Sequence, residues 1–408
     1  MHALRYGRQA GWLFQAAMLI FLVTVGLGMA RGLGIIDFED RNQVLTHLHS
    51  GTIGWITLGI MATALVLYST GDDRPAGGAL LSWASGLLVI GVPVYILAWW
   101  TGNLPFRAIS GSALLLGIVL FVGWLVREAA RIGYARLTTP QLAAVVGLVT
   151  LVVGSALGVT LQIQFASSTS VLPGDPIGAH AETQISAYLV LVAMSFAYWG
   201  LRGDDRTARG TWMIWLFFVA GAIIAISLLA DVFELSIMFV PFDLAAIIIF
   251  LTLTWRRVLA PGWLQAEATR HFAAAIPFAL FYFGMFVFII VGFAGLQLWE
   301  TFEDIPENFI PAAEHPLFVG MVTNILFGVL FGLNRGRRDI WPWADHVIFW
   351  GLNLAVAAFT LAILFNADDL FKFITPVLGL SILTGIITHS MRLWSTGGSA
   401  TVTSAVEP

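Results

Sequence analysis

The chain has 408 residues, of which 58% are hydrophobic and only 11% carry a charge. Its mean hydropathy of +0.86 excludes a water-soluble domain, because soluble domains carry about a quarter charged residues. The absence of cysteine excludes disulfides, thiolate metal sites, iron–sulfur clusters and covalent haem attachment, but leaves metal binding through histidine. No nucleotide-binding loop, catalytic nucleophile motif or nucleic-acid-binding patch is recognisable, so no nucleic-acid partner is expected.

Apolar stretches long enough to cross a bilayer, about 20 residues each, recur from one end of the chain to the other. They predict an all-α polytopic membrane protein, with a single membrane domain over residues 1–408 and about twelve transmembrane helices. The expected membrane helices are 11–32, 45–70, 78–99, 107–130, 140–164, 180–201, 211–230, 236–255, 272–297, 315–334, 343–365 and 370–393.

The basic residues predict the orientation of these helices. If the N-terminus is inside, all of the 20 basic residues except Arg31, Arg41, Arg107 and Lys372 fall on the inner side. Such an asymmetry is typical of the positive-inside rule. We therefore expect a multi-pass protein of a bacterial-type inner membrane, in contact with membrane lipid and with both termini in the cytoplasm.

A threefold internal repeat is indicated by three histidines, each at the expected outer end of a helix. His49, His180 and His315 are separated by 131 and 135 residues. Each of their helices ends in a similar polar turn, at 71–74, 203–206 and 336–339. The chain is thus expected to form three quasi-equivalent four-helix arcs. The expected repeats are about 1–138, 139–270 and 271–395, followed by a flexible C-terminal tail at 396–408.

A fourth histidine, His47, is separated from His49 by a single residue. Residues of a helix advance about 100° each, so these two side chains point to opposite flanks of one helix. They could pair with His315 on one flank and with His180 on the other. Two imidazoles on facing helices are the axial ligands that a haem iron needs. Haem propionates also need cations, and Arg41 and Arg107 are the candidates, with contacts to lipid headgroups as their alternative role.

Other ionisable residues have less specific interpretations. Glu182 and Asp243 are candidates for a proton path, because carboxyl groups at membrane depth are commonly functional; a loop position for Glu182 and a structural hydrogen bond for Asp243 are the alternatives. His271, His346 and His389 fall at expected inner helix ends, where an interfacial position is the simplest interpretation.

The segment "HLHSGTIGW" at 47–55 resembles the His-x-His-Ser-Gly-x-x-Gly-Trp segment of haem–copper oxidase subunit I, the C-type (cbb) branch in particular. "AEHPLFVGM", which contains His315, is similar to helices of that superfamily and of its NnrS-like relatives. The resemblance implies a twelve-helix fold and one or two b-type haems bound by His47, His49, His180 and His315. The family has its His-x-His pair on the tenth helix and further copper-binding histidines on the seventh. This chain has the pair on the second helix and no histidine at 211–230, which makes a copper centre doubtful.

These features favour a haem-binding membrane redox protein that transfers electrons or binds or reduces a diatomic gas, nitric oxide or oxygen. Whether it is an oxidoreductase is left open. A periplasmic cytochrome donor and other membrane subunits are the expected partners. Two alternatives remain: a twelve-helix secondary transporter, and a metal-free scaffold subunit of a membrane complex.

Overall fold

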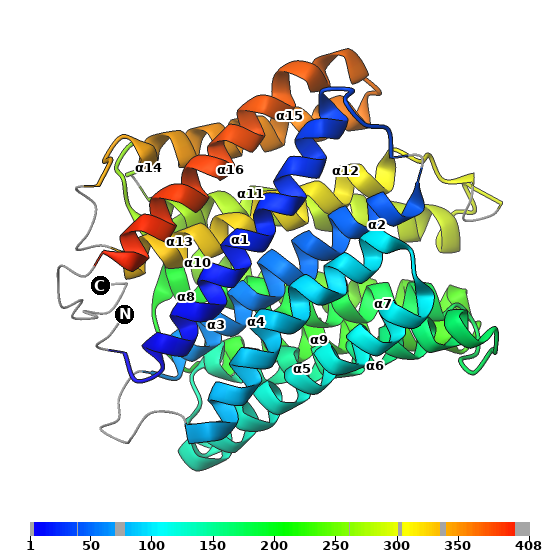
Figure 1. The fold of residues 1–408 in the computed structure, drawn as a ribbon, viewed down its shortest axis with the longest axis horizontal. Coiled ribbons are helices and arrows are strands. Elements are labelled where there is room, and N and C mark those ends of the chain that lie inside the picture. Colours follow the sequence, from blue (N-terminus) through cyan, green and yellow to red (C-terminus); the bar gives the residue numbers. More distant parts are fainter. Residues whose placement is uncertain are drawn as a thin grey trace. The chain divides into compact units, whose positions relative to one another are not determined.

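The fold was analysed in a computed structural model that describes residues 4–38, 40–69, 78–260, 262–300, 304–334 and 340–395. The tail expected at 396–408 and the turns expected at 71–74 and 336–339 lie outside these residues. The described chain is helical and without strands, and twelve of its helices are long and apolar enough to cross a membrane. The predicted all-α polytopic membrane class is therefore confirmed (Figure 1).

Five of these twelve spans are single α-helices, and the other seven are built from two or three consecutive helical segments. The single helices are α1 (Gly7–Gly32), α4 (Gly78–Thr101), α5 (Leu104–Ile132), α6 (Thr139–Ser167) and α9 (Ala208–Leu229). The composite spans are α2–η1–α3 (Arg41–His49, Ser50–Thr57, Leu58–Leu67), α7–η3–α8 (Pro176–Glu182, Thr183–Val190, Leu191–Arg202), η4–α10 (Phe233–Met238, Phe239–Val258), α11–η5 (Ala268–Ile290, Val291–Gly295), α12–η7–α13 (Phe309–His315, Pro316–Thr323, Asn324–Leu333), α14–η9–α15 (Ala344–His346, Val347–Gly351, Leu352–Leu364) and η10–α16 (Asp368–Leu370, Phe371–Trp394).

The chain divides into two compact units. Unit 1 contains α1, α2–η1–α3, α12–η7–α13, α14–η9–α15, α16 and nearly all of α11, and unit 2 contains α4 to α10 together with η5. Within unit 1 the first helix, α1, packs against the last, α16 (Figure 1). The unit boundary divides the first predicted repeat, because α1 to α3 belong to unit 1 whereas α4 and α5 belong to unit 2. The predicted repeats remain a prediction.

Local sequence signals set the ends of two helices in unit 2. The α6 helix begins with a capping box, in which the Thr138 side chain and the Gln141 amide bond each other's backbone N–H groups, with Pro140 in the first turn. The α8 helix ends at Gly203, whose φ of 93° lies in the left-handed region that favours glycine.

Three of the twelve spans are much more buried than the others. In the most apolar part of α2–η1–α3, α7–η3–α8 and α12–η7–α13, 83%, 83% and 78% of the residues are buried, against 50% or less in the remaining spans. These three spans carry the four histidines that were singled out as candidate ligands.

Candidate functional site

Each of the three most buried spans contains a π-helical segment of eight residues. The segments are Ser50–Thr57, Thr183–Val190 and Pro316–Thr323, and their first residues are 133 positions apart in both steps. A side-chain hydrogen bond shows the same wider turn: the hydroxyl of Thr57 donates to the carbonyl oxygen of Thr52, five residues earlier, at 2.9 Å. Such segments are uncommon and occur frequently at functional sites.

The common start of the π segments defines a register for the histidines. Immediately before each segment stand His49, Glu182 and His315, and two residues earlier stand His47, His180 and Ala313. The spacing of the histidines along the sequence had instead matched His49 with His180. The structural register makes His180 the counterpart of His47, and it puts the carboxylate of Glu182 where the other two spans have an imidazole.

Hydrogen bonds support this register. His47 bonds through Nδ1 to the carbonyl oxygen of Thr24 in α1, at 3.0 Å. His180 bonds through Nδ1 to the carbonyl oxygen of Gly154 in α6, at 2.8 Å. In both cases the acceptor belongs to the transmembrane helix that directly precedes the histidine's own span in the sequence. The two histidines are thus held in the same way in separate units.

The other register position uses a different acceptor. Nδ1 of His49 bonds the carbonyl oxygen of Leu45 at 2.7 Å, and Nδ1 of His315 bonds that of Pro311 at 2.8 Å. Both acceptors lie one helical turn earlier in the histidine's own span.

All four histidines therefore present the same ring nitrogen for ligation. A carbonyl oxygen can only accept, so Nδ1 must carry the proton and Nε2 of the neutral ring keeps its lone pair. A histidine that binds a metal is usually oriented in this way, by a hydrogen bond from its other ring nitrogen.

Glycines make room for two of these rings. A Cβ atom added to Gly28 in α1 would lie 3.1 Å from Cε1 of His47, and one added to Gly158 in α6 would lie 2.6 Å from Cε1 of His180. In each case the glycine lies one turn after the residue whose carbonyl group accepts the hydrogen bond. A larger residue at these positions would displace the imidazole.

His47 and His315 line one cavity of about 690 Å³ within unit 1. Its walls come from α1, α2–η1, α12–η7, α15 and the start of α16. Aromatic rings and glycines form much of the lining, including Phe21, Phe38, Trp55, Phe318, Phe359, Phe371, Gly28, Gly32 and Gly51. Because Arg31 in the lining is exposed and Trp55 is buried, the cavity extends from the protein surface into the interior.

Neither of the two arginines predicted to bind haem propionates lines this cavity. Arg107 is buried in unit 2, where its Nη2 donates to the carbonyl oxygen of Trp99 at 3.3 Å and its guanidinium lies 4.1 Å above the Trp99 ring. Arg107 thus covers the C-terminal end of α4 and is absent from the cavity. Arg41 is exposed and does not line the cavity either. Arg31, which was not predicted to contact haem, lines the cavity and forms an ion pair with Asp37.

The remaining candidates lie outside this cavity. His49 is not among its lining residues, and His180 belongs to unit 2, so their pairing remains a prediction. Glu182 accepts a hydrogen bond from the hydroxyl of Ser186 at 2.6 Å. Asp243 in α10 is only 5% exposed, and its side chain forms no hydrogen bond with another described residue. A buried carboxyl group in that position remains a proton-path candidate.

The histidines expected at inner helix ends behave differently from one another. His346 is exposed, in agreement with an interfacial position. His271 and His389 are each only 1% exposed, so the interfacial interpretation is wrong for both. Nδ1 of His271 bonds the side-chain oxygen of Asn324 at 3.1 Å, and the side-chain amide of Asn334 lies 3.3 Å from Nδ1 of His389.

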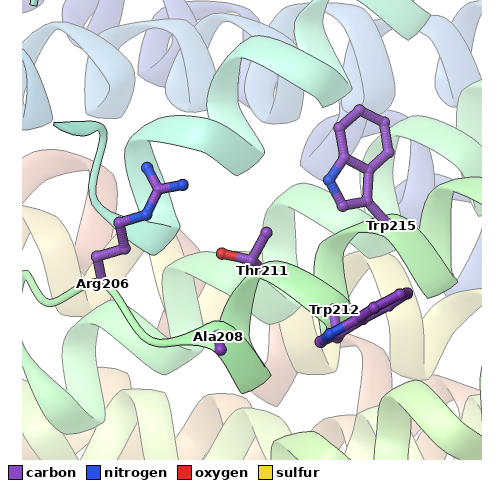
Figure 2. A pocket seen from close by; sticks show the side chains of 5 residues that line it. All are labelled: Arg206, Ala208, Thr211, Trp212 and Trp215. Atoms are coloured by element: carbon purple, nitrogen blue, oxygen red, sulfur yellow. The ribbon is translucent and has the colours of Figure 1, made fainter. Parts of the chain in front are cut away.

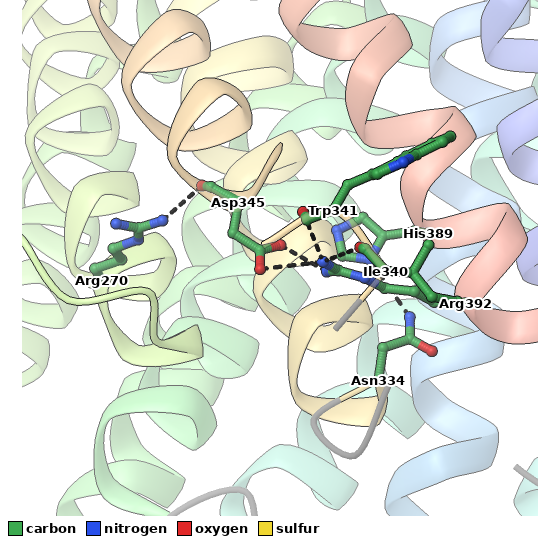
Figure 3. A network of polar contacts seen from close by, with 7 residues as sticks. All are labelled: Arg270, Asn334, Ile340, Trp341, Asp345, His389 and Arg392. Carbon is green, nitrogen blue, oxygen red and sulfur yellow. Dashed lines mark hydrogen bonds and ion pairs between the residues drawn. The ribbon is translucent and has the colours of Figure 1, made fainter. Parts of the chain in front are cut away.

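His389 belongs to a buried polar network in unit 1 (Figure 3). Its centre is an ion pair of 2.6 Å between Arg392 and Asp345, whose side chains are 0% and 2% exposed. Arg270 donates to the backbone carbonyl of Asp345 at 2.6 Å. The network joins α11, α14 and α16, and it leaves the charges of Arg392 and Asp345 compensated.

No family model matches the chain, and no curated protein matches it. The interpretation of the site therefore depends on its own geometry, and the resemblance to haem–copper oxidase subunit I remains a prediction.

Proposed function

We propose that the protein is a haem-binding integral membrane redox protein in which His47 and His315 hold a haem in the unit 1 cavity. One observation carries the proposal: two imidazoles, each fixed through Nδ1 to a backbone carbonyl, line the same cavity. Neutral imidazole nitrogen is a common ligand of haem iron.

The cavity fits such a group in size and chemistry. Its volume of about 690 Å³ lies within the ~300–1,000 Å³ that is typical of ligand and cofactor sites. Aromatic side chains suit a flat apolar macrocycle, and the glycines allow it to approach the backbone. The guanidinium of Arg31 lies in the lining, where it already pairs with Asp37, so a haem carboxylate would have to join or displace that ion pair.

The chain's own residues orient the ligands and limit the access of water. The carbonyl groups of Thr24 and Pro311 hold the two rings in one tautomer. Trp55, only 1% exposed, stacks on Phe21 with ring centroids 4.7 Å apart and closes the buried end of the cavity. Haem, when bound, supplies a one-electron redox centre, and an open iron position would in addition bind a diatomic gas.

We further propose that the protein lies in a bacterial-type inner membrane with both of its termini in the cytoplasm, on the basis of the distribution of basic residues. Electrons would then come from a periplasmic cytochrome, and other membrane subunits are further candidate partners.

A secondary transporter is the second candidate function. It is favoured by one observation in unit 2, the buried carboxyl group of Asp243, since such groups commonly take part in ion coupling. The metal-free scaffold explains less, because it gives no reason for four histidines with the same Nδ1–carbonyl arrangement.

Optical spectroscopy of the purified full chain, expressed with a haem supply, tests the proposal. We expect a haem spectrum that sharpens on reduction with dithionite. A reduced spectrum unchanged by carbon monoxide would indicate a haem iron with two histidine ligands, which serves in electron transfer. A shift would indicate an open iron position that binds gas. Folded protein without any haem absorbance would contradict the proposal and favour the transporter.

A further inference from the structure

A second hollow lies in unit 2, at the N-terminal end of α9. Its volume is about 520 Å³, and it is lined by Arg206, Ala208, Thr211, Trp212 and Trp215 (Figure 2). None of these residues takes part in the candidate haem site. The hollow combines one cation with two indole rings.

Arg206 is fixed on one side only. Its Nη1 donates to the carbonyl oxygens of Tyr134 and Leu137, at 2.8 and 3.0 Å. Its Nε and Nη2 groups have no hydrogen-bond partner among the described residues, and the side chain is exposed. The guanidinium is thus held in place while it retains donors for an anion, and a guanidinium matches the geometry of phosphate oxygens.

The two indoles lie on the other side of the hollow (Figure 2). Trp212 and Trp215 are 64% and 43% exposed, and a spacing of three residues places them on one face of α9. Exposed tryptophans at the end of a transmembrane helix are typical of the membrane interface, where the ring contacts lipid and its N–H contacts polar groups.

The surrounding charge favours an anion. Arg202 and Arg209 are also exposed near this end of α9. The nearby carboxylate of Asp205 is already engaged, by the hydroxyl of Tyr198 and by Arg202. Asp204, the other acidic residue of this loop, is exposed and forms no ion pair with Arg206 among the described residues.

We propose that this hollow binds an anionic phospholipid, with the headgroup phosphate on Arg206 and the glycerol and acyl carbons along Trp212 and Trp215. A free phosphate ion would use the arginine but gains nothing from two exposed indoles. The lining therefore fits a lipid better than it fits an inorganic anion.

Native mass spectrometry of the full chain, delipidated and then titrated with phosphatidylglycerol or phosphatidylcholine, tests this inference. We expect one phosphatidylglycerol to be retained in preference to phosphatidylcholine. Arg206→Gln should lower its affinity by about tenfold, since a charged hydrogen bond is lost. Arg209→Gln is the matched control, because it removes the same charge from a residue that does not line the hollow; it should lower the general attraction for anions and weaken binding clearly less than Arg206→Gln.

A second variant guards against misfolding of Arg206→Gln. Trp212→Leu combined with Trp215→Leu changes only exposed side chains and should also weaken lipid retention. The inference is overturned if Arg206→Gln and Arg209→Gln weaken binding equally, if the double tryptophan variant retains lipid as the wild type does, or if inorganic phosphate alone displaces the lipid. The result does not depend on haem, so it is separable from the proposed function.

Discussion

Two pairs of histidines in unit 1 differ in their surroundings although they share one compact unit. His47 and His315, the cavity histidines, have Nδ1 on backbone carbonyls and line an open volume. His271 and His389, the packed histidines, bond side-chain amides and are almost fully enclosed. Neither packed histidine is among the residues that line the cavity.

Aromatic packing explains the enclosure of the second pair. His271 meets the ring of Phe349 edge-on at 5.1 Å, and His389 stacks on Phe327 at 5.7 Å. Burial alone therefore does not distinguish the histidines proposed as ligands from those that pack against neighbouring helices. The proposed ligands differ because the backbone fixes one side of each ring and the other side faces free volume.

Substitution of a proposed ligand should give the largest difference in haem affinity between the two pairs of histidines. His47→Ala should lower haem affinity by more than about 100-fold, because the loss of a ligand exceeds the 10- to 100-fold effect of its supporting residues. His271→Ala should retain haem and lose only stability. Haem titration of both variants measures the difference, and an equal loss of haem from both would refute the distinction.

Disruption of the buried ion pair should have the largest effect on stability. Asp345→Asn leaves Arg392 buried without its counter-charge, which costs about 3–5 kcal/mol. Thermal unfolding in detergent should show a clearly lower Tm. Asp369→Asn is the control, since its partner Lys372 is 4.0 Å away in an exposed pair and no change is expected. Equal Tm values for the two variants would show that the network does not stabilise unit 1.

Crowding of a cavity histidine should have an intermediate effect. Gly28→Val would push against the ring of His47 and should lower haem affinity by about tenfold, as expected for a residue that orients a ligand. Gly26→Val on the same helix is the control, because no atom lies within 4 Å of a Cβ at that position. If both variants bind haem like the wild type, the ring does not depend on the glycine.

The smallest expected effect concerns the buried end of the cavity. Thr323→Val removes the acceptor for Nε1 of Trp55, at 3.0 Å, and should cost about 1 kcal/mol of stability without loss of haem. The half-buried Thr384, whose hydroxyl bonds only the carbonyl of Leu380, gives the control Thr384→Val. Chemical denaturation would show the difference, and a loss of haem from Thr323→Val would mean that the cavity collapses without this bond.

Hydropathy was sufficient to predict the spans. The helix expected at 343–365, for example, is observed at Ala344–Leu364. The π segments were not predictable in this way, because hydropathy does not distinguish a bond five residues back from one four residues back. Without the π segments, the alignment of the three buried spans was displaced by two residues in the second span. The equivalence of Glu182 with His49 and His315 was therefore missed.

Tertiary packing accounts for the other differences. A position near a helix end suggested that His271 and His389 lie at the interface, but neighbouring helices of unit 1 enclose both. The short Gly102–Asn103 turn brings Arg107 back onto the end of α4, which the spacing of charges alone does not reveal. Arg31 was counted only as one of the four basic residues outside the inner side, and its place in the cavity lining is visible only in the structure.

The haem content of the purified full chain is the most direct test of the central claim. The wild type, expressed with a haem supply, should contain at least one haem per chain by the pyridine haemochrome assay, and His47→Ala should contain far less. Folded wild-type protein without haem, or an equal haem content in the two proteins, would contradict the assignment of the cavity histidines as ligands.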